Sequence, residues 1–316
     1  MEKEKITIFI TGAGGFIGKH LLKKLSLLNI NLFLLIREED IVPNYLYNNI
    51  EWVKGDLNNP QSYCEFIKKS DIVIHMAAEL YNSVYFWKTN VEAVELLIEV
   101  INTSSVKKVI HLSSVGVVGM QYSSKTIIVD EDSPCLPKNE YERTKLISEK
   151  LWMEKLIDKD LVIIRPTNVF GEEHPREHLK NIIYHINMKK FFICSKYSMV
   201  NYVYVGDIAS SIVFFIKNIN ITGIFIVGES ISMRQFVCII RKHYASQCKI
   251  IYIPDLLFIL INLLKFLFPN KYISKILSLN NKVVYSDEKI KKHLQYEYGI
   301  ENGLKKTCDY YLESDK

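Results

Sequence analysis

Residues 5–18 read KITIFITGAGGFIG, a strand-length apolar run that passes into a glycine-rich turn, and a helical pattern follows to about Leu28. In a strand–turn–helix unit of this kind, the glycines make a tight turn, let the backbone approach a pyrophosphate, and pack the helix against the strand. The free N–H groups at the start of the helix favour an anion. We therefore predict that this turn binds a dinucleotide, through Gly12, Gly15, Phe16, Ile17 and Gly18.

Further apolar runs of strand length alternate with helical patterns along the chain, at residues 31–37, 50–57, 71–78, 106–112 and 161–165. Near-continuous apolar strands separated by helices predict a parallel sheet covered on both faces. The predicted fold class is α/β, a Rossmann-type doubly wound parallel sheet with a smaller C-terminal α/β substrate lobe. We expect a dinucleotide-binding domain at 1–165 and a mainly substrate-binding lobe at 166–316, with segments near 202–227 returning to the sheet.

The end of the second predicted strand bears on the choice of cofactor. An Asp or Glu there would accept hydrogen bonds from the ribose 2′-hydroxyl of NAD, but the chain has Ile36 followed by Arg37. A guanidinium can pair with a 2′-phosphate, so the sequence favours NADP over NAD. The alternatives are that Arg37 stacks on the adenine or faces water, and acidic residues at 38–40 weaken the preference.

Other predicted strand ends carry residues suited to cofactor binding. Asp56 could reach the adenine, and the small Ala77 and Ala78 would let the cofactor lie against the backbone. Ligands in parallel sheets lie outside the carboxyl ends of the strands, where these residues fall. We add Leu57 and Asn90, which opens a predicted helix to about residue 102, to the predicted cofactor-binding residues.

Tyr141 and Lys145 are four residues apart and therefore lie on one face of a predicted helix. A tyrosine hydroxyl has a pKa near ~10, and a nearby ammonium favours the phenolate and brings that pKa toward neutrality. Ser113 and Ser114 close the strand at 106–112, upstream of this pair. The order of glycine turn, serine and Tyr–Lys pair is the one that a nicotinamide oxidoreductase needs.

Composition excludes several other classes of protein. The chain has 316 residues, 48% hydrophobic and 24% charged, with a net charge of +5, which indicates a globular protein without a nucleic-acid patch. Six scattered cysteines and an N-terminus without a signal peptide predict reduced thiols and a cytoplasmic location.

Pro175 lies between His174 and His178, so we predict no metal site there. His75 and His111 are predicted to be packed core residues.

With these residues in hand, the chain resembles an extended short-chain dehydrogenase/reductase, and more narrowly the NAD-dependent epimerase/dehydratase family, which acts largely on nucleotide sugars. The resemblance also covers the segment from Arg165 to Gly171. It implies that Tyr141 is the general acid/base, that Lys145 binds the nicotinamide ribose, and that a serine five residues before a glycine contacts the substrate oxygen. Since Gly119 is that glycine, the serine is Ser114.

The resemblance implies further expectations about substrate and assembly. Asn168 matches a substrate-contacting position, so the predicted substrate-binding residues are Asn168, Ser114 and Tyr141. Family members often form homodimers through two helices, which here are residues 90–102 and 141–156. A small-molecule substrate, no nucleic acid and no stable membrane insertion are expected.

Departures from the family pattern narrow the reaction. Dehydratases carry Asp-Glu after the hydroxyl residue, where this chain has Val115-Gly116, so we argue against a dehydratase. An arginine that clamps the diphosphate is replaced by Val200, which leaves Arg176, Arg234 and Lys196 as unranked candidates. The preferred prediction is an NAD(P)-dependent 4-keto reductase or 4-epimerase acting on C4 of a nucleotide sugar. The alternative is an NADP-dependent dehydrogenase/reductase of an apolar alcohol, and the third is a non-catalytic NAD(P)-binding regulator.

Residues 256–268 form an apolar segment that is too short to span a bilayer and contains Asn262 and Lys265. We interpret it as a core or interface helix. The alternatives are docking on a membrane surface or covering an apolar substrate.

Overall fold

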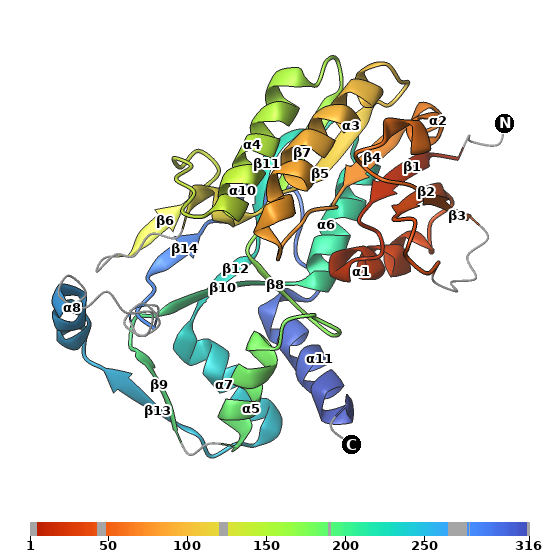
Figure 1. The fold of residues 1–316 in the computed structure, drawn as a ribbon. Helices are drawn as coiled ribbons and strands as arrows, with labels where there is room; N and C mark the ends of the chain where they lie inside the picture. The colour runs from red at the N-terminus through yellow and green to blue at the C-terminus, as the bar shows by residue number, and fades with distance from the viewer. Residues whose placement is uncertain are drawn as a thin grey trace.

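The computed structural model describes residues 5–42, 49–119, 126–188, 191–264, 277 and 279–314. Its centre is a seven-stranded sheet in the order β11-β7-β5-β4-β1-β2-β3, with every neighbouring pair parallel (Figure 1). The strands are β1 (Thr7–Thr11), β2 (Asn31–Ile36), β3 (Ile50–Lys54), β4 (Ile72–His75), β5 (Lys108–Leu112), β7 (Asp160–Pro166) and β11 (Gly223–Val227). All six strands predicted from apolar runs are present, and the predicted α/β class is confirmed.

The alternation of side chains along β1 divides the core of this sheet into two layers. Ile8 and Ile10 lie in a cluster with helices α1 (Phe16–Leu25), α6 (Val205–Lys217) and α10 (Glu288–Lys291). Phe9 lies in the opposite cluster, with α2 (Cys64–Lys68), α3 (Ala93–Asn102) and α4 (Glu140–Lys155). Helices therefore cover both faces of the sheet, and α1 and α6, far apart in the sequence, pack directly on each other (Figure 1).

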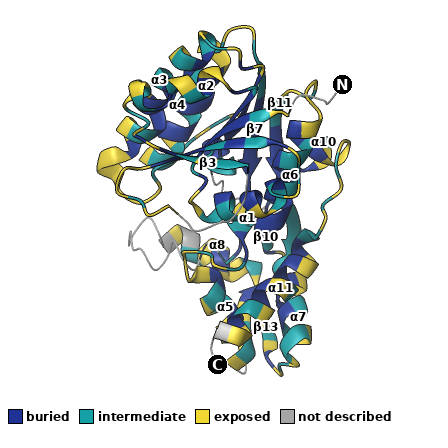
Figure 2. Ribbon diagram, turned by 90° about the vertical axis from the view of Figure 1, so that its right-hand side faces the viewer, coloured by how far each residue is buried: buried dark blue, intermediate teal, exposed yellow. Residues whose placement is uncertain are grey.

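A smaller lobe follows β7 and has its own sheets and core. Its three-stranded sheet has the order β12-β10-β8, and β13 pairs with β9 in a separate ribbon. The elements are β8 (Asn168–Phe170), α5 (His178–Met188), β9 (Phe191–Ser195), β10 (Met199–Tyr204), β12 (Glu229–Ser232), α7 (Met233–Tyr244), β13 (Lys249–Ile253), α8 (Asp255–Leu264) and α11 (Gly299–Ser314). Phe170, Phe236 and Leu304 are among the buried residues of its core. Figure 2 colours the buried residues of the chain dark blue.

The last helix is fixed to both lobes at its first turn. The carboxylate of Asp207, in the first turn of α6, accepts hydrogen bonds from the N–H groups of Tyr298 (2.9 Å) and Gly299 (3.0 Å). The carboxylate of Glu229 accepts one from the N–H of Ile300 at 2.6 Å. These carboxylates satisfy N–H groups that have no partner inside the helix, so they hold α11 against the substrate lobe.

The apolar segment at 256–268 differs from its core interpretation where the structure describes it. In α8 only Phe258 among the large apolar side chains of known exposure is buried, whereas Leu256 is 67% and Leu263 64% exposed. Residues 265–268 lie outside the described residues. Across the described ranges, none of the helices combines the length and the apolar character needed to cross a membrane.

Candidate active site

The glycine turn between β1 and α1 is shaped by close backbone approach. Gly12 has φ +77°, and a Cβ there would lie 2.6 Å from the backbone N of Ala77. A Cβ on Gly18 would lie 2.3 Å from the carbonyl oxygen of Ala13, so both positions require glycine. Helix α1 begins after Gly15 and has no acidic residue in its first turn. Its N–H groups are therefore available to an anion, and the turn fits a dinucleotide pyrophosphate.

The ends of β1 and β4 are tied together beside this turn. The hydroxyl of Thr11 lies 2.8 Å from Nδ1 of His75 and accepts a hydrogen bond from the N–H of Ala77 at 3.3 Å. Ala77 and Ala78 are half-buried and follow directly. His75 and His111 are buried, as predicted, and their rings stack at 5.3 Å. The carboxyl end of the sheet is thus fixed where a cofactor would lie.

The predicted cofactor residues at β2 and β3 are exposed and already engaged. Arg37 makes an ion pair with Asp40 at 2.8 Å and another with Glu39 at 3.4 Å. Its pKa is raised by the hydrogen bond to Asp40. The side chain of Asp56 accepts two hydrogen bonds from Asn58, and the backbone one is the main reason that its pKa is lowered. A 2′-phosphate at Arg37 would therefore approach a guanidinium that faces two carboxylates.

Leu57 and Asn90 have structural contacts in the protein. The hydroxyl of Tyr63 donates to the carbonyl of Leu57 at 3.1 Å. Asn90 is 2% exposed, accepts from the N–H of Glu79 at 2.9 Å, and donates to the carbonyl of Glu79 and the hydroxyl of Thr144 at 3.2 Å each. Asn90 thus fastens the loop after β4 to α4, and its amide hydrogen atoms are used within the protein.

Lys145 is buried beneath the carboxyl end of β5. The residue is only 2% exposed, and its Nζ donates a hydrogen bond to the carbonyl of Leu112 at 2.8 Å. Burial lowers its pKa to about 8, and the charge of Glu149 opposes that shift. Two residues after Leu112, Ser114 accepts a hydrogen bond on Oγ from the N–H of Gly116 at 3.0 Å. Ser113 is buried, and its hydroxyl makes no hydrogen bond with the described residues.

The first turn of α4 brings Tyr141 to the same strand end. Asn139 caps this helix by accepting from the N–H of Glu142 at 2.9 Å. Glu142 lies against Gly116, where a Cβ would be 3.0 Å from its Cγ. The helix therefore contacts the 3-10 turn at Val115–Val118 that follows Ser114. Ser114 thus begins the turn after β5, and Tyr141 and Lys145 both lie on α4, the helix that packs on this turn.

The pKa of Tyr141 departs from the sequence prediction. Burial raises it to about 12, and the cation that opposes this shift is Arg176. Its ring packs against that of Phe86, with centroids 5.9 Å apart. Lys145 was expected to lower this pKa, but its ammonium points to the Leu112 carbonyl and desolvation dominates at the phenol. At neutral pH the phenol is therefore protonated and able to donate its proton.

A buried ion pair extends this helix face by one more turn. Glu149 is 0% exposed, and Nη2 of Arg165 contacts its carboxylate at 2.6 Å, with Nε at 3.0 Å from the other oxygen. Sequence reasoning missed this residue. The signal was available, because Tyr141, Lys145 and Glu149 follow one another at four-residue intervals on one face.

The three candidate anion anchors differ in their surroundings. Arg176 lies over the ring of Tyr81 at 5.1 Å, and its charge is felt at Tyr141. Among the described residues it makes no ion pair. Arg234 and Lys196 are exposed, and neither contributes to the shift at Tyr141. Asn168 is exposed and donates from its amide to the carbonyl of Asn201 at 3.0 Å.

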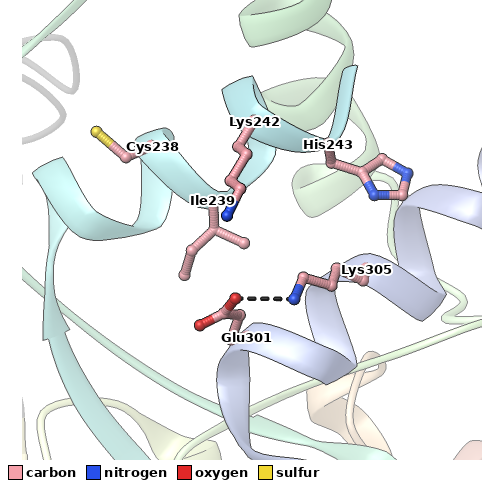
Figure 3. A pocket seen from close by; sticks show the side chains of 6 residues that line it. All are labelled: Cys238, Ile239, Lys242, His243, Glu301 and Lys305. Atoms are coloured by element: carbon pink, nitrogen blue, oxygen red, sulfur yellow. Dashed lines mark hydrogen bonds and ion pairs between the residues drawn. The ribbon is translucent and has the colours of Figure 1, made fainter. Parts of the chain in front are cut away.

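A hollow of about 440 Å³ lies apart from this site, between α7 and α11 (Figure 3). It is lined by Cys238, Ile239, Lys242, His243, Glu301 and Lys305. Lys305 and Glu301, which are four residues apart on α11, form an ion pair at 2.8 Å on one side of the hollow. None of the sequence-predicted site residues lines it.

The family model described as NAD dependent epimerase/dehydratase family matches residues 8–228. One similar protein, from Escherichia coli O157:H7, is N-acetyl-alpha-D-glucosaminyl-diphospho-ditrans,octacis-undecaprenol 4-epimerase; it is 29% identical over 67% of this chain and 63% of its own length. Another, a decarboxylating sterol-4-alpha-carboxylate 3-dehydrogenase from Dictyostelium discoideum, is 31% identical over 52% of this chain and 53% of its own length. The matches thus span about half to two thirds of these relatives.

A solved structure has the same fold over nearly the whole chain. The crystal structure of UDP-glucuronic acid 4-epimerase from Bacillus cereus in complex with NAD has a TM-score of 0.72. It covers 98% of this chain and 100% of that chain, at 20% sequence identity. At this identity the likeness concerns the architecture.

Proposed function

The chain belongs to the NAD-dependent epimerase/dehydratase family, and from this premise we propose that it oxidises or reduces C4 of a sugar carried on a diphosphate. The observation that carries the proposal is the buried Lys145, held at 2.8 Å on the Leu112 carbonyl, on the same helix face as Tyr141 and next to the strand end that bears Ser114. A buried ammonium on the helix that carries a tyrosine, next to a strand end followed by a serine, supports proton transfer at a carbonyl or secondary alcohol.

Each residue of the trio has a distinct role in the proposed reaction. The nicotinamide cofactor, when bound, supplies or accepts the hydride. Tyr141, protonated at neutral pH, donates its O–H proton to the carbonyl oxygen when the substrate is reduced and regains it when the alcohol is oxidised. Ser114 donates a hydrogen bond to the same oxygen, and Lys145 would bind the nicotinamide ribose. The positive charge of Arg176, which opposes the rise in the pKa of Tyr141, favours the phenolate left on that residue.

The diphosphate of the substrate needs a cationic side chain. The arginine that the family resemblance implies for this role is replaced here by Val200, a buried core residue. We propose Arg176 for this role because its guanidinium is exposed, lacks an ion pair among the described residues, and acts on Tyr141. Arg176→Ala should raise the KM for a nucleotide sugar by at least about tenfold, the loss of one charged hydrogen-bond donor. The rise in the midpoint of thermal unfolding that the cofactor causes should stay the same. Arg234→Ala is the matched control, and an equal effect from it would contradict the assignment.

The cofactor is a nicotinamide dinucleotide, as the family requires. The preference for NADP rests on Arg37, whose guanidinium faces Asp40 and Glu39. Asp40→Asn removes one competing carboxylate and should raise the affinity for NADP relative to NAD. Titration of each cofactor by intrinsic fluorescence measures the ratio. If neither Asp40→Asn nor Arg37→Ala changes it, Arg37 does not contact the 2′ position.

The experiment that tests the function is thermal denaturation of the purified protein with NAD, NADP and a panel of sugars carried on nucleoside or polyprenyl diphosphates. A ligand that binds only the native state raises the midpoint by mass action. A cofactor shift that grows with one sugar diphosphate supports the proposal. An epimerase then shows no net redox change, whereas a reductase consumes NAD(P)H, and the absorbance at 340 nm follows that consumption.

The second candidate is a dehydrogenase/reductase of an apolar alcohol. The relative from Dictyostelium discoideum, at 31% identity, and the absence of an arginine at Val200 favour it. A cofactor shift without a response to any sugar diphosphate, together with turnover of a sterol, would select this candidate.

The predicted homodimer through residues 90–102 and 141–156 is a separate proposal, and light scattering tests it.

A further inference from the structure

Helix α8 exposes apolar side chains around most of its circumference. Leu256, Leu257, Ile259, Leu260 and Leu263 are between 46% and 67% exposed, and Phe258 is fully buried. A helix on the surface of a globular protein normally turns one apolar stripe inward and a polar face to water. Among the α8 residues whose exposure is described, Phe258 is the buried one, and the five exposed apolar residues face solvent.

The ribbon of β9 and β13, which precedes α8 in the chain, also exposes apolar side chains. In its parallel register Phe191 pairs with Lys249 and Ile193 with Ile251, so these four side chains share one face. Phe191, Ile193 and Ile251 are 49%, 40% and 48% exposed. The opposite face of the ribbon packs against the core of the substrate lobe. We call the eight exposed residues of the ribbon and α8 the apolar face: Phe191, Ile193, Ile251, Leu256, Leu257, Ile259, Leu260 and Leu263.

The charges around the apolar face are positive. Lys249 lies on the same ribbon face and is exposed, and Lys196 is exposed just after β9. The acid at the start of α8, Asp255, is paired with Lys282 at 2.7 Å. The surroundings therefore complement a negatively charged surface.

This combination identifies one occupant. Protein interfaces are enriched in aromatic residues and arginine and depleted in lysine, whereas the apolar face is mainly Leu and Ile bordered by lysines. A second copy of the chain would oppose like charges across a two-fold axis. Aliphatic side chains with a basic border are the features of a protein that lies on an anionic bilayer without spanning it. We propose that the apolar face docks on the surface of a membrane of anionic phospholipid.

The proposal concerns the exposed face alone and does not depend on the reaction catalysed. Docking would place the substrate lobe, to which the ribbon and α8 belong, against the lipid headgroups. The Leu and Ile side chains would enter the boundary of the headgroups, and the lysines would contact the anionic groups.

Flotation of the full chain with vesicles tests this proposal. Vesicles of phosphatidylglycerol and phosphatidylcholine should carry the protein, vesicles of phosphatidylcholine alone should carry much less, and raised salt should reduce binding. Leu256→Glu with Leu260→Glu should lower binding to the anionic vesicles by at least about tenfold. The matched control is Leu27→Glu with Ile157→Glu, which changes equally exposed apolar residues elsewhere and should leave binding unchanged.

Folding of each variant is checked by its thermal midpoint with and without cofactor. Failure of the native chain to float with anionic vesicles would overturn the proposal, as would equal loss of binding in both double variants. Sedimentation measures self-association in parallel. A dimer that Leu256→Glu with Leu260→Glu abolishes, without vesicle binding by the native chain, would assign the face to a second copy.

Discussion

Replacing Lys145 with methionine should abolish turnover and yet stabilise the protein at neutral pH. The ammonium is 2% exposed, and burial lowers its pKa from 10.5 to about 8. Below pH 8 the folded protein therefore carries a charge that the unfolded chain holds more easily in water. The difference of about 2.5 pKa units corresponds to about 3.5 kcal/mol of lost stability, at about 1.4 kcal/mol per unit.

The net gain is smaller because the substitution also removes the hydrogen bond to the Leu112 carbonyl. That bond has a charged donor and contributes about 1.5 kcal/mol, which leaves about 2 kcal/mol in favour of Lys145→Met at pH 7. For a chain of 316 residues this raises the midpoint of thermal unfolding by about 3 °C. Between pH 8 and pH 10.5 the native lysine is deprotonated in the folded protein but still protonated in the unfolded chain, so wild-type stability rises with pH. The advantage of the variant therefore disappears over this pH range.

Thermal denaturation of both proteins at pH 7, 8, 9 and 10 measures this difference, because groups common to both cancel. Lys108→Met is the matched control. Lys108 is also buried with a pKa lowered to about 8, but its Nζ donates to three carbonyls, of Asn218, Ile219 and Ile221, at 2.8–2.9 Å. Its loss leaves three acceptors at the end of α6 without a donor, so it should destabilise. A lower midpoint for Lys145→Met at pH 7, or a difference independent of pH, would refute the reasoning.

Two further substitutions test the site. Tyr141→Phe removes the proton donor and should reduce kcat at least about 100-fold, while cofactor still raises the thermal midpoint as in the native protein; unchanged turnover would exclude Tyr141 as the acid/base. Glu149→Gln leaves the Arg165 guanidinium buried without its carboxylate and should cost about 3–5 kcal/mol. Glu149→Leu combined with Arg165→Met should recover most of that loss, since no charge is then left buried. Denaturant unfolding measures the stability of both variants. A double variant no more stable than the single one would argue against the charge explanation.

The sequence predicted the local elements best. The strands came from apolar runs, and the requirement for glycine at 12 and 18 follows from the turn between β1 and α1. The Tyr141–Lys145 spacing also predicted correctly that both lie on one helix. These features depend on residues close together in the chain, whose periodicity and backbone needs can be read directly.

Features that depend on burial and long-range contact could not be predicted. The pKa of Tyr141 rises because neighbours such as Phe86, from the helical segment that precedes α3, exclude water from it. Arg165 meets Glu149 only because β7 and α4 pack together. For the segment at 256–268 the apolar composition was clear, but whether α8 would face the core or solvent depended on which elements pack against it.

The packing of α1 against α6 has a consequence for how the protein is made. A ribosome releases α1 about 190 residues before α6 is complete, which corresponds to about 10–40 s of synthesis. During that interval Leu21, Leu22 and Leu25 lack the partner that covers them in the finished protein. Nascent chains of this protein should therefore recruit chaperones at this face and release them when α6 emerges. A stalled chain ending after β7 would stay bound, and one extended past Lys217 would be freed.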